Sequence, residues 1–239
     1  ELGEEQNIYT TLLSYGLNQK HIKTLIEKYK EKTLHEINKN PYILCKEIHS
    51  FSFKKADKVA LEMGIEPNNR NRIGEALKYC LEFSKMGGHC YLPIIYLYPL
   101  VSNVVDLKLN LSEMEEIYLK NKYKKQCSIL RNNKEYTINI NDLKECIYRY
   151  KTSKTLNEKE SNMYYLYSLK DSEFENAINF LKLEGDIVYE NDNVYLTDVY
   201  RSEIDFANCI KKLNKYRKIY SRELVEKVLD EICLENGYK

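Results

Sequence analysis

The feature that most constrains this chain is the run Asn40–Ile65, NPYILCKEIHSFSFKKADKVALEMGI, which predicts a helix, a short turn and a second helix. Asn40 is a good N-cap, and Pro41 suits the first helical position because its missing N–H costs nothing there. The second helix has one face of small and apolar residues, namely Ala56, Val59, Ala60 and Met63. Gly64 supplies a left-handed stop. Such a hairpin aims backbone N–H groups at one surface spot, where they can hold a phosphate, so nucleic acid is the leading expected partner.

A similar hairpin is predicted over residues 6–38. Its second helix is amphipathic, with apolar residues at the spacing i, i+3, i+4, i+7: Ile22, Leu25, Ile26 and Tyr29. The preceding turn, Tyr15–Asn18, has the hydrophobic–Gly–hydrophobic pattern of a phosphate-binding hairpin, in which Asn18 is able to take a left-handed conformation. Thr33 and Glu36 predict a capping box for the next short helix. A closing helix over 69–85, ended by Gly87-Gly88, completes a tandem helix-hairpin-helix bundle.

The first run resembles the helix-hairpin-helix region of bacterial RecD-like DNA helicases (the RecD–TraA family), which reads NPY-x-L, G-I-G-F, K-x-A-D-x-I-A and G-I. The matching residues are Asn40, Pro41, Tyr42, Leu44, Phe53, Lys54, Ala56, Asp57, Ala60, Gly64 and Ile65. Further similar positions are Arg72-Ile73, Gly88–Pro93, Val194–Leu196, Tyr200, Glu203 and Ala207. One departure is conspicuous: both hairpin glycines are serines here, Ser50 and Ser52.

The resemblance implies a parent helicase that unwinds DNA 5′ to 3′ with ATP and magnesium, in DNA repair and recombination in the bacterial cytoplasm. This chain has no Walker motif, and its only Gly-Gly pair precedes His89 rather than lysine. None of the four histidines lies in a recognisable catalytic arrangement, so we predict no catalytic site and no cofactor for this chain. The chain begins at Glu1 and, in the family, the motor begins just after the point where this sequence ends. We therefore expect a non-catalytic piece placed before the motor.

The candidate DNA contacts lie in the two hairpin turns and at one arginine: Ser50, Phe51, Ser52, Lys54, Lys55, Gly16, Asn18, Lys20 and Arg72. In the family's pattern, glycines let the backbone approach a phosphate without a Cβ in the way. Serine narrows that approach, yet its hydroxyl can donate to phosphate, so phosphate contact and plain helix capping both stay open. For Arg72 a structural salt bridge is the alternative. Asp57 is expected to orient the hairpin through hydrogen bonds to backbone N–H groups.

The charge distribution limits the strength of any DNA contact. The net charge is +1, with 14 lysines and arginines against 12 acidic residues over 1–90 and 14 against 17 over 151–239. Because backbone affinity scales with the phosphates neutralised, contacts should be local and weak. The basic runs 120–125 and 211–222 are interpreted as solvated helix faces, with DNA contact as the alternative. The tyrosine clusters at 91–98 and 164–167 are interpreted as core, with base stacking as the alternative.

The seven cysteines form no C-x-x-C pair and are odd in number, which favours reduced cytosolic thiols. A zinc site from Cys80, His89 and Cys90 would lack a fourth ligand at standard spacing, so no metal is predicted. There is no signal peptide and no apolar run near the ~20 residues that span a membrane, so no membrane partner is expected.

Beyond Tyr91 the pattern becomes mixed. A pair of strands is predicted around the turn Asn132-Asn133, over Ser128–Arg131 and Tyr136–Ile140. A later helix is expected to begin with a capping box formed by Ser172 and Glu175 and to end at Gly185. Its predicted inward residues are Phe174, Ala177, Ile178 and Leu181. A hairpin of residues 186–190 and 193–197 follows, as in the back half of a winged helix, and then two helices at about 199–215 and 221–235.

The predicted fold class is mainly α. We expect a tandem helix-hairpin-helix domain (1–92), an inserted α+β segment (93–160), a winged-helix-like α+β unit with short β-hairpins (161–200) and a helical linker toward the motor (201–239). The leading hypothesis is an accessory region that makes sequence-independent backbone contacts to duplex, forked or single-stranded DNA and positions the motor. The alternative, favoured by the near-zero charge and the serines, is a protein-docking scaffold with little DNA binding.

Overall fold

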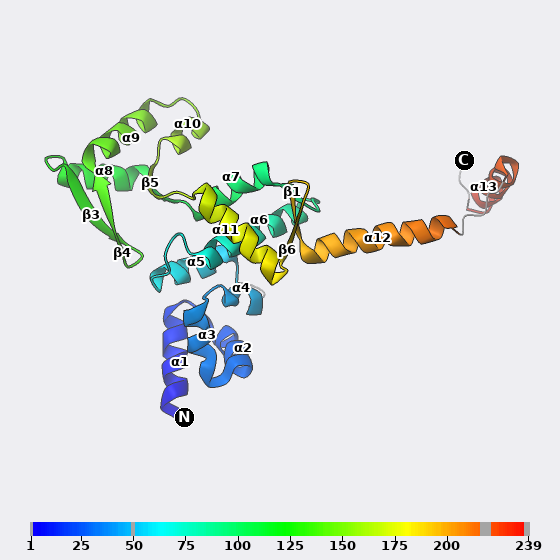
Figure 1. Ribbon diagram of the computed structural model, residues 1–239, viewed down its shortest axis with the longest axis horizontal. Coiled ribbons are helices and arrows are strands. Elements are labelled where there is room, and N and C mark those ends of the chain that lie inside the picture. Colours follow the sequence, from blue (N-terminus) through cyan, green and yellow to red (C-terminus); the bar gives the residue numbers. More distant parts are fainter. Residues whose placement is uncertain (1, 49–50, 216–220, 237–239) are drawn as a thin grey trace. The chain divides into compact units, whose positions relative to one another are not determined.

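The computed structural model describes residues 2–48, 51–215 and 221–236 (Figure 1). The chain is mainly helical with a few short antiparallel strands, and it divides into two units, residues 1–196 and 197–239.

The first unit opens with the helices of two hairpins and a closing helix. They are α1 (Leu2–Ser14), α2 (Gln19–Tyr29), α3 (Thr33–Lys39), α4 (Ile43–Glu47), α5 (Phe53–Glu62) and α6 (Arg70–Met86). A short 3-10 turn, Lys30–Lys32, joins α2 to α3. The predicted left-handed stop at Gly64 is confirmed by its φ of +87°, and Gly16 in the first turn also has a positive φ, +77°. Of the predicted inward face of α2, Ile22 and Leu25 are fully buried.

Asn18, which is able to be left-handed, is extended here (φ −86°, ψ 166°), and its side chain caps α2. Two local predictions about helix starts were wrong. The Thr33 capping box does not form, because the 3-10 turn runs directly into α3, and the Thr33 hydroxyl donates instead to the Lys30 carbonyl at 2.5 Å. Helix α4 begins at Ile43, two residues after Pro41.

Helix α6 also belongs to a second layer, in which it packs against α7 (Ile94–Val105) and α11 (Asp171–Glu184). Gly74 of α6 allows close packing there, because a Cβ built on it would lie 3.4 Å from the Leu181 side chain. The apolar face predicted for α11 is buried, and Gly185 ends the helix at φ +76°. The capping box expected from Ser172 and Glu175 does not form at those residues. The helix is capped two residues earlier, at Lys170, whose backbone N–H donates to the Glu173 carboxylate at 3.1 Å.

A three-stranded antiparallel sheet lies beside these helices, in the order β1 (Leu92–Pro93), β7 (Asn193–Leu196), β6 (Ile187–Glu190). The predicted hairpin of β6 and β7 is confirmed, and both turn residues, Asn191 and Asp192, have positive φ. Strand β1 precedes α7 in sequence and pairs with β7 far along the chain.

Between α7 and α11 the chain makes an excursion over residues 107–167, which overlaps the insertion expected from the sequence and is called the insertion below. Its elements are β2 (Leu107–Leu109), α8 (Leu111–Asn121), β3 (Gln126–Arg131), β4 (Lys134–Asn139), α9 (Ile140–Thr152), α10 (Leu156–Ser161) and β5 (Tyr164–Tyr167). Strands β2 and β5 pair, so the insertion leaves and rejoins the rest at one place. It has its own small core of Leu109, Met114, Ile138 and Leu143.

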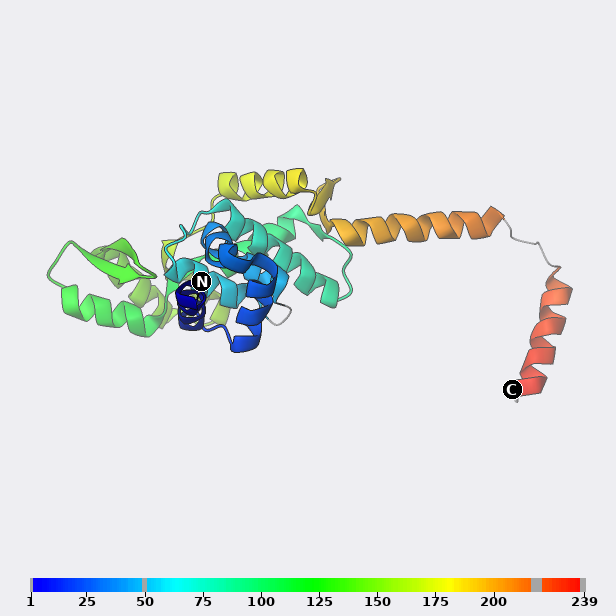
Figure 2. The same ribbon diagram turned by 90° about the horizontal axis from the view of Figure 1, so that it is seen from below.

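The predicted hairpin inside the insertion is confirmed as β3 and β4, with Asn132 and Asn133 both left-handed at the turn. Its tip touches the end of α5: the Asn133 side-chain amide donates to the Glu62 carbonyl at 2.6 Å, and Lys134 pairs with Glu66. Figures 1 and 2 both show this tip beside α5. The insertion is thereby connected to the second helical hairpin as well as to its own flanking strands.

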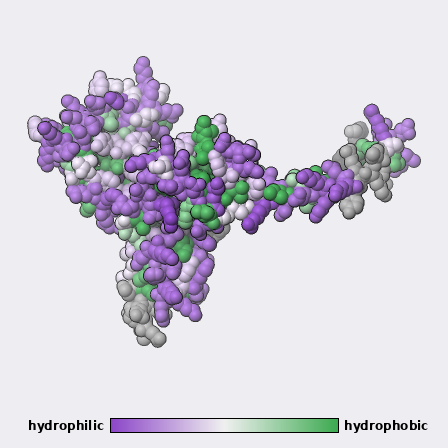
Figure 3. Space-filling model, in the orientation of Figure 1, coloured by the Kyte–Doolittle hydropathy of each residue, from purple (hydrophilic) through white to green (hydrophobic). Residues whose placement is uncertain are grey.

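The second unit contains α12 (Thr197–Lys215) and α13 (Arg222–Asn236), as predicted. Each carries a series of exposed large apolar side chains: Ile204, Phe206, Ile210 and Leu213 on α12, and Leu224, Val225, Val228, Leu229 and Ile232 on α13. Figure 3 shows apolar residues among hydrophilic ones along α12.

Candidate nucleic-acid interface

The first hairpin turn joins α1 to α2 through Gly16. The Gly16 and Leu17 N–H groups donate back to the end of α1, at 2.9 and 3.2 Å, and Leu17 is buried beneath the turn. A Cβ built on Gly16 would meet nothing within 4 Å, so the space outside this turn is open. Asn18 accepts from the His21 N–H at 2.9 Å, and Lys20 is exposed in the first turn of α2. The first N–H groups of a helix have no intrahelical carbonyl partner, which makes such a helix start suited to an anion.

The second turn joins α4 to α5, and Ser50 lies outside the described residues. Ser52 is exposed and holds the N-cap position of α5, with its carbonyl accepting from the Lys55 and Ala56 N–H groups at 3.0 and 3.1 Å. The Ser52 hydroxyl makes no capping hydrogen bond. The backbone of Ser52 has φ −68° and ψ 158°, so a serine occupies this position without strain. Lys54 and Lys55 are exposed in the first turn of α5.

The two turns touch each other. The His21 ring, at the start of α2, packs edge-on against the Phe51 ring at 6.1 Å between centroids. Phe51 is only 6% exposed, so it anchors the turn and cannot itself contact DNA in this conformation, contrary to the sequence prediction. Nothing in the local pattern indicates this pairing, because a long-range ring contact has no periodicity. Its consequence is that the start of α2 lies beside the turn that leads into α5, and the lysines in the first turns of these two helices, Lys20, Lys54 and Lys55, are all exposed.

Arg72 is excluded from that surface, which corrects the sequence prediction in favour of its structural alternative. The side chain is fully buried, and its Nε and Nη2 donate to the two carboxylate oxygens of Asp57 at 2.8 and 3.0 Å. Nη1 donates to the Pro67 carbonyl at 2.8 Å. A buried guanidinium engaged at all three nitrogens cannot reach a phosphate.

Asp57 orients the second hairpin through side chains, and no backbone N–H group among the described residues donates to it as the sequence led us to expect. Besides Arg72 it accepts from the Tyr42 hydroxyl at 2.7 Å. Burial raises the pKa of that hydroxyl well above its ordinary value, and the neighbouring Asp57 carboxylate raises it further. The Tyr42 ring stacks on Phe53 at 5.8 Å. These contacts link α4, α5 and α6, so the hairpin is held rigidly behind its exposed turn.

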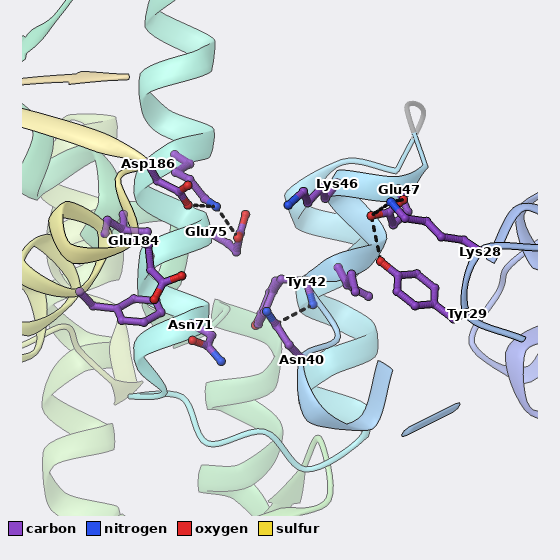
Figure 4. A pocket seen from close by; sticks show the side chains of 15 residues that line it. Lys28, Tyr29, Asn40, Tyr42, Lys46, Glu47, Asn71, Glu75, Glu184 and Asp186 are labelled. Carbon is purple, nitrogen blue, oxygen red and sulfur yellow. Dashed lines mark hydrogen bonds and ion pairs between the residues drawn. The ribbon is translucent and has the colours of Figure 1, made fainter. Parts of the chain in front are cut away.

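A cleft of about 340 Å³ lies between α2 and α4 on one side and α6, α11 and β6 on the other (Figure 4). Its charged side chains are Lys28, Lys46, Lys78, Glu47, Glu75, Glu184 and Asp186. Most of them pair locally. Lys28 contacts Glu47 at 2.6 Å, and its hydrogen bond holds the pKa of that carboxyl below its usual value.

On the facing wall, Lys78 bridges Glu75 and Asp186 at 2.6 and 2.9 Å. Burial raises the pKa of Glu75 above its ordinary value, despite the opposing effect of Lys78. With four carboxylates and three lysines, this cleft is unsuited to a phosphate backbone. We therefore assign the candidate interface to the hairpin turns.

The other sequence candidates separate into packed and exposed groups. Tyr98 packs on Phe174 at 5.1 Å and donates to the Leu169 carbonyl, while Tyr167 donates to Glu173 at 2.9 Å, so the packing interpretation holds for these two. Tyr96 stays 64% exposed.

Within the described residues no three His, Cys, Asp or Glu side chains are grouped to hold a metal. No helix there combines the length and apolar character needed to cross a membrane.

Residues 1–91 match the family model of the ATP-dependent RecD2 DNA helicase HHH domain. The matched range ends just before β1 and contains both hairpin turns and α6. It agrees with the resemblance carried by the Asn40–Ile65 run. The N-terminal part of this chain is therefore similar to the helix-hairpin-helix region of RecD-like helicases.

Proposed function

We propose that this chain is a non-catalytic, DNA-binding accessory region of an ATP-dependent 5′-to-3′ helicase of the RecD-like type. The observation that carries the proposal is the shared surface of the two hairpin turns. The His21–Phe51 contact joins two helix N-termini, and Lys20, Lys54 and Lys55 are exposed around them. Outward N–H groups and ammonium groups together suit phosphates and carry no base information, so binding would be sequence-independent.

The serine-substituted turn is compatible with this role. Ser52 has an ordinary backbone conformation, and its exposed hydroxyl is not used for capping. In the proposal this hydroxyl donates to a phosphate oxygen, which offsets the closer backbone approach that a glycine would permit. Asn18 and Gly16 shape the first turn, and Lys20 supplies its charge.

We further propose that the layer behind this surface is a winged helix interrupted by the insertion. The order α6–β1–α7–α11–β6–β7 and the sheet order β1-β7-β6 support this reading. The β6–β7 turn would be the wing. The pairing of β2 with β5 supports an insertion over 107–167, shorter and later than the expected 93–160, because α7 packs on α6.

The second unit would connect this region to the motor, where ATP and magnesium would be bound. This also defines the second candidate function, a docking scaffold for the motor or a partner protein. The exposed apolar residues of α12 and α13 favour it, since faces of this kind are normally covered. The two functions are compatible in one chain, but only the first requires DNA affinity.

Fluorescence anisotropy with labelled duplex, forked and single-stranded DNA at 50 and 200 mM salt tests the leading proposal. We expect micromolar binding that weakens steeply with salt. Lys54→Glu/Lys55→Glu should weaken duplex binding by about ten-fold or more, because two phosphate contacts become repulsive. Lys32→Glu/Lys39→Glu is the matched control, with the same charge change at two exposed lysines outside both turns.

No binding by the wild type at low salt would reject the DNA role and leave the scaffold. Equal weakening by the two double variants would show that only net charge matters and would reject the turn surface as the contact.

A further inference from the structure

The end of α8 opens into an exposed basic loop, residues 122–125, which the sequence predicted to be a helix face. Helix α8 ends at Asn121, and β3 begins at Gln126. The loop sequence is Lys-Tyr-Lys-Lys, and all four side chains are exposed. Tyr123 is 92% exposed, an unusual state for an aromatic ring that nothing covers.

The three lysines of this loop are available for a ligand. Lys120, one turn earlier, is already paired with Glu116 at 2.5 Å. Lys122, Lys124 and Lys125 form no ion pair with any residue that the structure describes. The insertion as a whole is basic, with 12 lysines and arginines against 8 acidic residues over 107–167, so no local acidic excess cancels the loop.

The loop is held in place by its backbone. The Lys124 N–H donates to the Asn121 carbonyl at 2.8 Å, and the Lys125 carbonyl accepts from the Ile140 N–H at 3.0 Å. The Lys122 ammonium lies 5.0 Å from the centre of the Tyr123 ring. The backbone of the loop is therefore fixed at two points, and the Lys122 ammonium and the Tyr123 ring are neighbours on it.

Among nucleic acids, this combination favours a single strand. Lysines bind phosphates of any DNA, but a projecting ring has no base to contact in a stacked duplex. In single-stranded DNA every base exposes a face, and stacking on an aromatic side chain strengthens binding by roughly 5- to 150-fold per base. A protein partner with an acidic surface would use the lysines alone.

The loop lies at the opposite end of the β3–β4 hairpin from the tip that contacts α5. On the path from Lys125 to Ser52, six strand residues and ten helical residues, at about 3.4 and 1.5 Å each, account for ~35 Å, and the hairpin turn with its contact to α5 adds to this length. A DNA molecule of one to two duplex turns can span that path, since one turn is about 34–36 Å long.

We propose that the loop Lys122–Lys125 is a second DNA site, which binds single-stranded DNA with Tyr123 as a stacking surface and the lysines on its phosphates. The inference rests on the proposed function in requiring a DNA-binding chain, but not on contact by the hairpin turns. Together the two sites would hold the duplex and the unpaired strand of a fork.

The test measures anisotropy of labelled twenty-nucleotide oligothymidine and of a blunt duplex with the whole chain. Lys122→Glu/Lys124→Glu should weaken single-strand binding at least five-fold and flatten its salt dependence. Tyr123→Ala should weaken single-strand binding about five-fold, the lower end of the stacking range, and leave duplex binding within two-fold, whereas Tyr123→Phe should behave as the wild type. Lys154→Glu/Lys170→Glu, at two other exposed lysines, controls for net charge.

The outcomes separate the two proposals. If only Lys54→Glu/Lys55→Glu weakens binding, the hairpin function stands and the loop site is rejected. If only the loop variants weaken it, the loop stands and the turn surface fails. Equal loss of duplex and single-strand binding in Tyr123→Ala would reject stacking, and binding of an acidic peptide in place of DNA would reject the DNA site itself. Circular dichroism of each variant excludes misfolding as the cause.

Discussion

The carboxylate of Asp57 receives two hydrogen bonds from the guanidinium of Arg72, one to each oxygen, inside the first unit. This pair ties the second helical hairpin to α6, and it explains why an arginine that matches the family pattern is structural. Two residues on adjacent helices thus fix the rear of a surface whose front is proposed to meet DNA.

Arg72→Ala should lower the free energy of unfolding by about 3–5 kcal/mol, because it leaves the Asp57 carboxylate buried without its cation. Urea denaturation followed by circular dichroism measures this change. Arg70→Ala is the control: Arg70 is exposed and lies over the Phe180 ring at 4.6 Å, so its loss should cost only about 0.5–1 kcal/mol. Similar losses in the two variants would contradict the role given to the buried pair.

The Tyr42 hydroxyl predicts a dependence of stability on alkaline pH. Its pKa is raised in the folded state by burial and by Asp57, so the folded protein keeps a proton that the unfolded chain loses near pH 10. This contribution is fully present below about pH 10 and is lost as the pH rises above it. Tyr42→Phe should be less stable than the wild type at pH 8 by about 1.5–3 kcal/mol, the value of a hydrogen bond to a charged group.

That difference should narrow between pH 9 and 11 in paired unfolding curves. A constant difference across the range would show that the Tyr42 proton does not contribute to folding.

Restoring glycine at position 52 should not increase DNA affinity. Ser52 already has a backbone conformation open to every residue, so Ser52→Gly gains no new approach and loses a hydroxyl. We expect duplex affinity to fall or stay within two-fold. A marked gain in affinity for Ser52→Gly would reject the proposed use of the hydroxyl.

Gly16→Ala is the contrasting case. An alanine held at the φ of +77° that Gly16 adopts should lower the free energy of unfolding by about 1–2 kcal/mol, although the added methyl group meets open space.

The tip of the β3–β4 hairpin should protect the end of α5. Asn133→Gly keeps the left-handed backbone of the turn while removing the side-chain bond to Glu62, and Lys134→Ala removes the pair with Glu66. The double variant should show faster amide exchange over residues 62–69, measured by mass spectrometry, with the core around Ile138 unchanged. Exchange that rises throughout the insertion would instead indicate that the hairpin itself had opened.

The local structure of this protein was largely predictable from its sequence. Helices that bury an amphipathic face, glycine stops such as Gly64 and Gly185, and the Asn132-Asn133 turn all follow from short-range rules, and each is confirmed. The errors lie at helix starts. Thr33 and Ser172 have the residue types of caps, but the neighbouring turn, not the side chain, decides where those helices begin.

Long-range relationships were not predictable. The His21–Phe51 contact and the β1–β7 pair join segments far apart in the chain, and neither has a periodic signature. For the candidate site, residue type indicated Lys20, Lys54 and Lys55 correctly as exposed cations. It could not distinguish the exposed Ser52 from the buried Phe51 and Arg72, because burial is set by packing partners elsewhere in the sequence.

The pairing of β2 with β5 has a consequence for how this chain can vary in length. Paired strands lie about 5 Å apart, so the two ends of the insertion are only one strand spacing from each other. The distance between the ends of α7 and α11 that join it therefore does not depend on the length of the insertion. Residues can be added or removed beyond that junction, away from the β3–β4 tip that contacts α5, without moving α7 and α11 apart. The architecture thus lets the insertion change in length while the helices on either side of it keep their spacing.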